Sequence, residues 1–192
     1  RHSLAAALLE PTWETQLLQR GLHWLPVINT NGWNEYQSID TRWNDYRHID
    51  AIVAIRQLHL WRPGYRSKPA TKLYNAWLAG VPAILGRELA YRTEGTIGIN
   101  YLEANSMAEL LSCIDTLQQN VTLRRTLVKN GKLRAAHYTS ASIVNRWQQF
   151  LDRVAVPSYR TWCRRFSWQR QLQQSQAKIV HYCDRARRRL QP

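Results

Sequence analysis

Three cationic side chains, Arg66, Lys68 and Lys72, lie within one short stretch at the predicted start of a helix. Pro69 suits such a start, because its missing N–H would be unpaired in the first helical turn in any case. Cationic side chains and the first N–H groups of a helix both attract anions, and phosphates in particular. The spacing therefore predicts the phosphate-facing end of a helix.

Three further polar residues could reach the same place. Arg56 follows a predicted strand at 50–55, Asn75 lies one helical turn beyond Lys72, and Glu88 lies on a loop predicted after a second strand. An amide can donate and accept hydrogen bonds, and a carboxylate accepts them from hydroxyl groups. The competing interpretation is a surface role for each, with Glu88 paired to Arg87 or Arg92.

Between these residues the sequence predicts a helix followed by a buried strand. Leu73 and Trp77 recur at helical spacing, and Gly80 ends the helix. Residues 81–85 are short and wholly apolar, which is typical of a strand that is buried on both faces. Ligands of open α/β sheets bind at the carboxyl ends of such strands, so this segment predicts a ligand-binding edge.

The remaining pattern predicts a chain of mixed strands and helices. A helix is expected over 4–20, closed by Gly21, with Pro11 either breaking it or starting its second half. Further elements are a strand at 23–28, a helix at 106–119 with a capping box at Ser106, a helix at 122–136, and a helix capped by Ser140 or Ser142.

The run from Lys68 to Glu88, centred on Ala79-Gly80-Val81-Pro82, resembles the donor-binding half of GT-B glycosyltransferases such as those of families 1 and 4. There, a helix that ends in Ala-Gly-Val-Pro and runs into a short strand is the most recognisable segment. The resemblance covers roughly residues 20–151, including the strand at 50–55 and the helical run with Asn130-Gly131.

The resemblance implies an α/β fold in which helices flank a Rossmann-like parallel sheet, one half of a GT-B enzyme. Such an enzyme transfers a sugar from a nucleotide-sugar to a hydroxyl of a glycan, a lipid or a small molecule, and must neutralise a diphosphate that gains charge as it leaves. No metal or cofactor is required by this interpretation, and no catalytic base is assigned. The expected donor-binding residues are Arg56, Arg66, Lys68, Lys72, Asn75 and Glu88.

The sequence departs from the family pattern at two positions. Many retaining members carry two glutamates eight positions apart in this segment, and the second of them meets the nucleotide ribose. Aligned on Ala-Gly-Val-Pro, this chain has Ser67 and Asn75 there. Asn75 can hydrogen-bond a hydroxyl or a phosphate oxygen but carries no charge.

The length of 192 residues is short for two Rossmann-like domains, so we expect a fragment. We predict a helix at 1–21 that links to or remains from a missing N-terminal domain, a donor-binding domain at 22–151, and a basic helical extension at 152–192. Cys113, Cys163 and Cys183 lack metal-binding spacing, which favours a reducing compartment. Without an apolar run of membrane-spanning length, a cytoplasmic location is predicted.

The extension at 152–192 is strongly basic. It carries ten Lys or Arg against two Asp, so +8 of the net charge of +14 lies there. A helix at 159–190 would present Trp162 and Phe166 on one side, and such a basic amphipathic helix could lie on an anionic membrane at its inner face. Packing against the missing half is the simpler interpretation, and nucleic acid is the least favoured partner.

Three functional hypotheses follow. The first is the donor-binding domain of a sugar transferase. The second is a non-catalytic module of the same fold, suggested by Ser67 and Asn75 in place of glutamates. The third is a basic adaptor that binds membrane or nucleic acid through residues 157–192.

Overall fold

The computed structural model describes residues 4–27, 45–56 and 68–190, the last six of these as backbone only. The chain divides into two compact units, residues 1–136 and 137–192. Among the described residues all strands belong to the first unit, and the second unit is helical. The predicted domain limits at 21/22 and 151/152 remain predictions.

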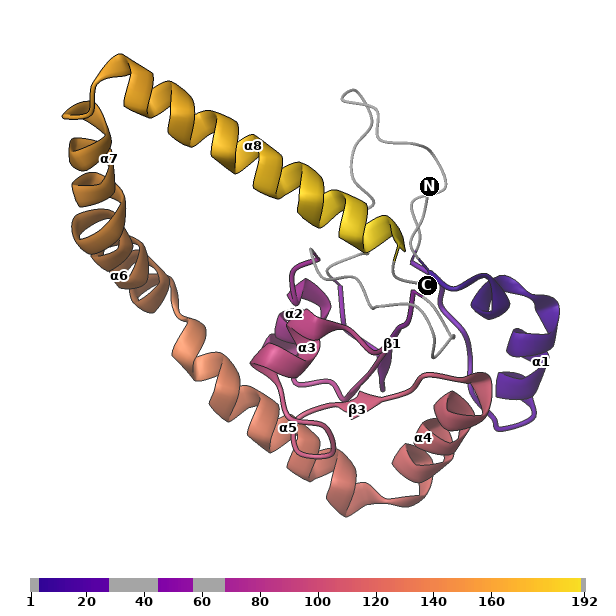
Figure 1. The fold of residues 1–192 in the computed structure, drawn as a ribbon. Helices are drawn as coiled ribbons and strands as arrows, with labels where there is room; N and C mark the ends of the chain where they lie inside the picture. The colour runs from indigo at the N-terminus through magenta and orange to yellow at the C-terminus, as the bar shows by residue number, and fades with distance from the viewer. Residues whose placement is uncertain (1–3, 28–44, 57–67, 191–192) are drawn as a thin grey trace, which may run out of the picture. The chain divides into compact units, whose positions relative to one another are not determined.

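A small parallel sheet forms the centre of the first unit (Figure 1). Its strands are β1 (Ile52–Ala54), β2 (Ala83–Leu85) and β3 (Leu102–Glu103), in the order β1-β2-β3. Both pairings are parallel, with Ile52 opposite Ala83 and Ile84 opposite Leu102. The chain is therefore an α/β protein, as the sequence predicts.

Helices cover both faces of this sheet (Figure 1). On one side lie η1 (Ala6–Leu9), α1 (Pro11–Leu18) and α4 (Met107–Gln119), and on the other lie α2 (Thr71–Ala79) and α3 (Leu89–Glu94). Pro11 starts α1 and Gly21 adopts a positive φ of 69°, so the N-terminal helix is divided at Pro11. The main buried cluster joins Leu8, Trp13, Ile84, Leu110 and Ile114. The N-terminal segment thus shares the core of the sheet.

The turn from α2 into β2 explains the Ala-Gly-Val-Pro sequence. Gly80 takes a left-handed conformation with φ of 70°, which costs glycine less than any other residue. The N–H of Gly80 donates to the carbonyl of Trp77, and the N–H of Val81 donates to that of Ala76. These two bonds form a Schellman motif, which closes the helix and sends the chain directly into a buried strand.

Helix α5 (Val121–Ala135) packs on α2 through a glycine. A Cβ atom on Gly131 would lie 2.4 Å from Cδ1 of Trp77, so only a residue without a side chain fits there. The Trp77 ring is 2% exposed, and its Nε1 donates to the carbonyl of Asn100 at 2.9 Å. These contacts fix the position of α2 relative to the rest of the unit.

Three local predictions for the first unit are wrong. Residues 23–27 form no strand, because only Trp24 among them packs closely, edge-to-face on Trp13 at a centroid distance of 5.6 Å; Ile28 lies outside the described residues. Residues 89–94 form α3 where a loop was expected. At the start of α4, the Ser106 side chain accepts from the Glu109 N–H as predicted, but the Glu109 carboxylate accepts from the N–H of Asn105.

The second unit contains α6 (Ser140–Phe150), a π-helical turn η4 (Leu151–Ala155), α7 (Val156–Cys163) and α8 (Ser167–Leu190). Thr139 caps α6, where a serine was predicted, because its side chain accepts from the N–H of Ser142. The predicted continuous helix at 159–190 is interrupted at 164–166, where the N–H of Phe166 donates to the Gln169 side chain. In the described part of the chain, no helix combines the length and the apolar character needed to cross a bilayer.

Replacing Gly131 with alanine should destabilise the first unit, although alanine is the better helix former by about 1 kcal/mol. The added methyl group would overlap the buried Trp77 ring, and overpacking of this kind costs on the order of 1–3 kcal/mol. Urea denaturation measures the change. As a control, Thr126→Ala at an exposed position of α5 should be neutral or slightly stabilising; equal effects of both substitutions would contradict the packing argument.

Candidate functional site

The carboxyl ends of β1 and β2 bring Arg56 and Glu88 together. Because the two strands are parallel neighbours, the residues that follow them lie at the same edge of the sheet. Nη1 of Arg56 donates to both carboxylate oxygens of Glu88. The Glu88 side chain is 3% exposed and that of Arg56 is 16% exposed, so this ion pair is largely removed from water.

Burial dominates the electrostatics of this pair. It raises the pKa of Glu88 above its ordinary value, while the positive charges of Arg56 and Lys68 act in the opposite direction. The free-energy cost of removing the Glu88 carboxylate from water thus exceeds the favourable interaction with these cations, as is common for buried ion pairs. The effect on Glu88 also means that Lys68 lies close to the same edge.

Lys72 lies in the first turn of α2, beside the ion pair. Burial lowers the pKa of its ammonium group below the ordinary 10.5, and the positive charge of Arg56 lowers it further. Two cations are therefore held near each other at a partly buried position. A bound anion would relieve the repulsion between them.

The beginning of α2 and its buried face carry further hydrogen-bond donors. Ala70 occupies the N-cap position, and no side-chain oxygen of the described residues caps the first N–H groups of the helix. One turn further, Nδ2 of Asn75 is buried, and none of the described residues accepts a hydrogen bond from it. Both features suit a ligand that carries acceptor oxygens.

Tyr91 belongs to this cluster as well, which sequence analysis did not recognise. It lies in the first turn of α3, its side chain is fully buried, and no described residue gives its hydroxyl an ordinary hydrogen bond. Burial and the Glu88 charge raise its pKa, while Arg56 acts to lower it. Had 89–94 been predicted as a helix, Tyr91 would have been expected on the face that meets Glu88.

The structure brings Arg56, Lys68, Lys72 and Glu88 together, and it places Asn75 on the same helix as Lys72. Arg66 lies outside the described residues. The competing interpretation, in which Glu88 pairs with Arg87 or Arg92, is wrong, since Glu88 pairs with Arg56.

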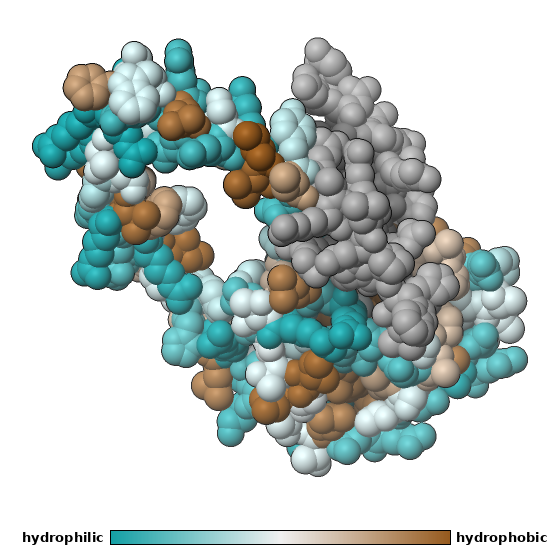
Figure 2. All heavy atoms as spheres, viewed as in Figure 1, coloured by the Kyte–Doolittle hydropathy of each residue, from teal (hydrophilic) through white to brown (hydrophobic). Residues whose placement is uncertain are grey.

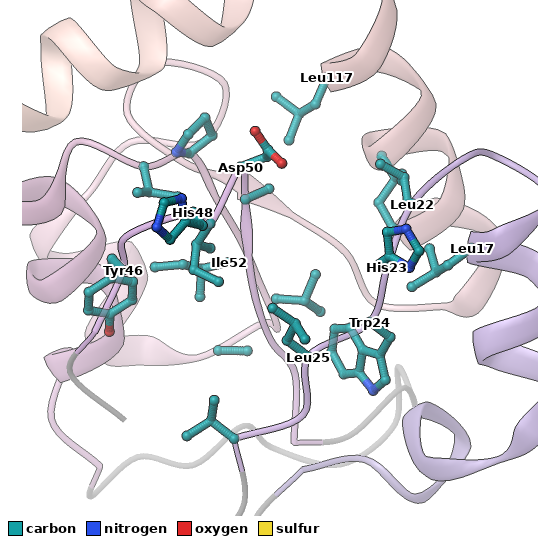
Figure 3. Close-up of a pocket in the computed structure, with 18 of the residues that line it drawn as sticks. Leu17, Leu22, His23, Trp24, Leu25, Tyr46, His48, Asp50, Ile52 and Leu117 are labelled. Carbon is teal, nitrogen blue, oxygen red and sulfur yellow. The ribbon is translucent and has the colours of Figure 1, made fainter. Parts of the chain in front are cut away.

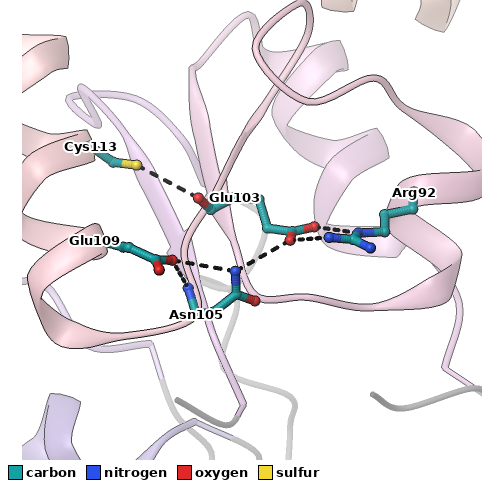
Figure 4. Close-up of polar contacts among 5 residues, drawn as sticks. All are labelled: Arg92, Glu103, Asn105, Glu109 and Cys113. Carbon is teal, nitrogen blue, oxygen red and sulfur yellow. Dashed lines mark hydrogen bonds and ion pairs between the residues drawn. The ribbon is translucent and has the colours of Figure 1, made fainter. Parts of the chain in front are cut away.

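Arg92 instead holds the end of β3 (Figure 4). Its guanidinium binds Glu103 through two hydrogen bonds of 2.8 and 2.6 Å, and Asn105 links Glu103 to Glu109. Sγ of Cys113 lies 3.8 Å from the Glu103 carbonyl, and burial raises the pKa of this thiol. Each carboxylate in this network already accepts hydrogen bonds. We therefore assign the network to holding β3 in place and not to binding or catalysis.

A large cavity runs along the edge of β1 that faces away from β2. Its volume is about 1230 Å³, and its lining includes Arg56 and Lys72 at the carboxyl end of the strand and Asp50 at the other end. Figure 3 shows His23, Trp24 and Leu25 facing it from one side, and Tyr46, His48 and Asp50 from the other. The volume is sufficient for a ligand of nucleotide size.

No protein-family model matches this chain, and no curated protein sequence matches it. In the described ranges, no group of three His, Cys, Asp or Glu side chains lies close enough to hold a metal ion. Among the described residues, the ends of β1 and β2 and the start of α2 bring together the cations Arg56 and Lys72 and the buried carboxylate of Glu88.

Substituting Arg56 with alanine should destabilise the first unit by on the order of 3 kcal/mol, because it leaves the Glu88 carboxylate buried without its partner. The loss should depend on pH. A carboxyl whose pKa is raised on folding favours the native state below its unfolded pKa, and this contribution disappears as the pH rises through the folded pKa. Arg56→Ala should therefore be least destabilising in acid.

Urea denaturation at several pH values measures this dependence. Arg47→Ala is the matched control, because Arg47 and Asp45 form an exposed pair at 2.6 Å, and exposed ion pairs contribute little to stability. A loss in Arg56→Ala that is small and independent of pH would contradict the buried-pair argument.

Proposed function

We propose that the first unit is the nucleotide-sugar-binding half of a GT-B glycosyltransferase, with a Rossmann-like sheet. The observation that carries this proposal is the meeting of Arg56, Lys72 and the start of α2 at the carboxyl edge of two parallel strands. Ligands of α/β sheets bind at that edge, and helix starts bind phosphates there. The Lys68–Glu88 segment supplies the family resemblance.

The groups at this edge have distinct roles in the proposed reaction. Lys72, Arg56 and the first N–H groups of α2 bind the donor diphosphate and stabilise the charge that it gains as the sugar leaves. Glu88 holds the Arg56 guanidinium in one orientation. The unpartnered Nδ2 of Asn75 donates to a phosphate or ribose oxygen.

A non-catalytic module of the same fold is the second candidate. It is favoured by Asn75, which stands where retaining enzymes carry glutamate, and by Glu88, both of whose oxygens are taken by Arg56. Asn75→Ala decides between the two. Sugar transfer by a longer form of the chain should fall with this substitution if the site is catalytic, and binding of an unrelated partner should be unaffected.

Nucleotide binding tests the proposal directly. One nucleotide class among UDP, GDP, ADP and CMP, or its sugar conjugate, should raise the melting temperature of this chain, because it binds the native state alone. Lys72→Ala should weaken calorimetric binding about tenfold or more, as expected for a charge-assisted contact to phosphate worth about 1.5–3 kcal/mol. Lys129→Ala, at an exposed position of α5, is the matched control.

Two results would contradict the proposal. The first is the absence of a melting shift and of binding heat for every nucleotide and conjugate at millimolar concentration. The second is equal weakening by Lys129→Ala and Lys72→Ala, because binding would then reflect only the general positive charge of the unit.

The pH dependence of binding gives an independent test. Only the charged ammonium of Lys72 attracts a diphosphate, and its pKa lies below 10.5 in the free protein. Affinity should therefore begin to fall at a lower pH than for an ordinary lysine. Lys72→Arg should bind at neutral pH and keep its affinity through this range, because a guanidinium does not lose its proton there. An identical pH profile in calorimetry for both proteins would exclude Lys72 from the phosphate contact.

A further inference from the structure

The described residues of the second unit form no hydrophobic core of their own. None of the side chains described between residues 137 and 184 is buried. Large apolar groups lie open along its helices (Figure 2). Eight of them are between 47% and 61% exposed: Val144, Trp147, Phe150, Val154, Trp168, Leu172, Ile179 and Val180. A helical segment without burial is marginally stable in water, so another surface must cover these groups.

These apolar groups form stripes on the helices. In α8, Trp168, Leu172, Ile179 and Tyr182 follow one another at intervals of four, seven and three residues, which places them on one side of the helix. Ile143, Trp147 and Phe150 repeat the pattern in α6. Each stripe includes tryptophan, an aromatic residue that favours the boundary between water and lipid.

Most of the charged residues of the unit are cationic. Residues 137–192 contain eleven Lys or Arg against two Asp, so they carry +9 of the net charge of +14. Cations that surround an apolar stripe fit a surface with anionic head groups above an apolar layer. Among the described residues Arg153, Arg160 and Lys178 supply such charge.

A second copy of the unit and nucleic acid each fit only one of these two features. A second copy of this unit would bring two groups of like charge together, which disfavours contact. Nucleic acid would match the cations, but its outer phosphates offer nothing apolar to cover Trp168 or Ile179. An anionic bilayer satisfies both.

We propose that residues 137–192 bind the surface of an anionic lipid membrane, with the stripes of α6 and α8 in contact with the acyl boundary and the cations among the head groups. The proposal rests on the exposure and charge of this unit and is independent of the function proposed for the first unit. It concerns a helix that lies on the membrane and does not cross it.

Vesicle flotation with the full chain tests the proposal. The chain should float with vesicles that contain phosphatidylglycerol and remain behind with vesicles of phosphatidylcholine alone, and added salt should weaken binding. The double variant Trp168→Ser, Ile179→Ser should bind much more weakly. Leu78→Ser is the matched control, because Leu78 is 69% exposed on α2 in the first unit.

Charge variants make the test quantitative. Arg160→Gln and Lys178→Gln should each lower the partition coefficient about fivefold, the usual contribution of one cation at an anionic surface. Lys129→Gln in the first unit should leave it unchanged. Lipids brominated in their acyl chains should quench part of the tryptophan fluorescence, and Trp147→Phe with Trp168→Phe should reduce that part.

Four results would overturn the proposal. They are no flotation with anionic vesicles, equal flotation with neutral vesicles, flotation that Trp168→Ser and Ile179→Ser leave intact, and a stable dimer in light scattering that the same two substitutions dissociate. The last would assign the stripes to a second copy of the chain. Retention on duplex DNA without vesicle binding would assign the cations to nucleic acid and would equally exclude the membrane.

Discussion

The parallel pairing of β2 between β1 and β3 is the constraint on which the first unit depends. β2 is buried at all three residues and hydrogen-bonded on both edges. Both of its neighbours run parallel to it, so the three strands end at the same side. Helices on both faces complete this burial. The common direction is also what brings Arg56 and Glu88, which are far apart in sequence, into contact.

At that side the fold brings positively charged groups together and partly removes them from water. Glu88 neutralises Arg56 at the cost of its own desolvation, while Lys72 has a depressed pKa because water is excluded and Arg56 is near. Such an arrangement is unfavourable in the absence of a ligand. An anion that binds at such a site gains additional binding free energy, because it relieves the repulsion between cations that is already present in the free protein.

How much the sequence could predict depended on whether the signal was local. The Schellman turn at Gly80, the strand that follows and the cap at Ser106 involve neighbouring residues, and all three were predicted. The partner of Glu88 was not, because it comes from a strand earlier in the chain. For 23–27, the apolar residues suggested a strand. A strand also needs a neighbouring strand to pair with, and whether one is present depends on the tertiary structure.

The Gly131–Trp77 contact links a position on α5 to the cations at the start of α2. Trp77 shares helix α2 with Lys72 and Asn75, and it is held between Gly131 and the carbonyl of Asn100 at the end of the helix away from the cations. Because a helix moves as a rigid rod, a small displacement at this rear support would tilt its front end. The size of one side chain on α5 thus influences where the cations at the start of α2 lie, and affinity could be tuned without altering any residue that touches a ligand.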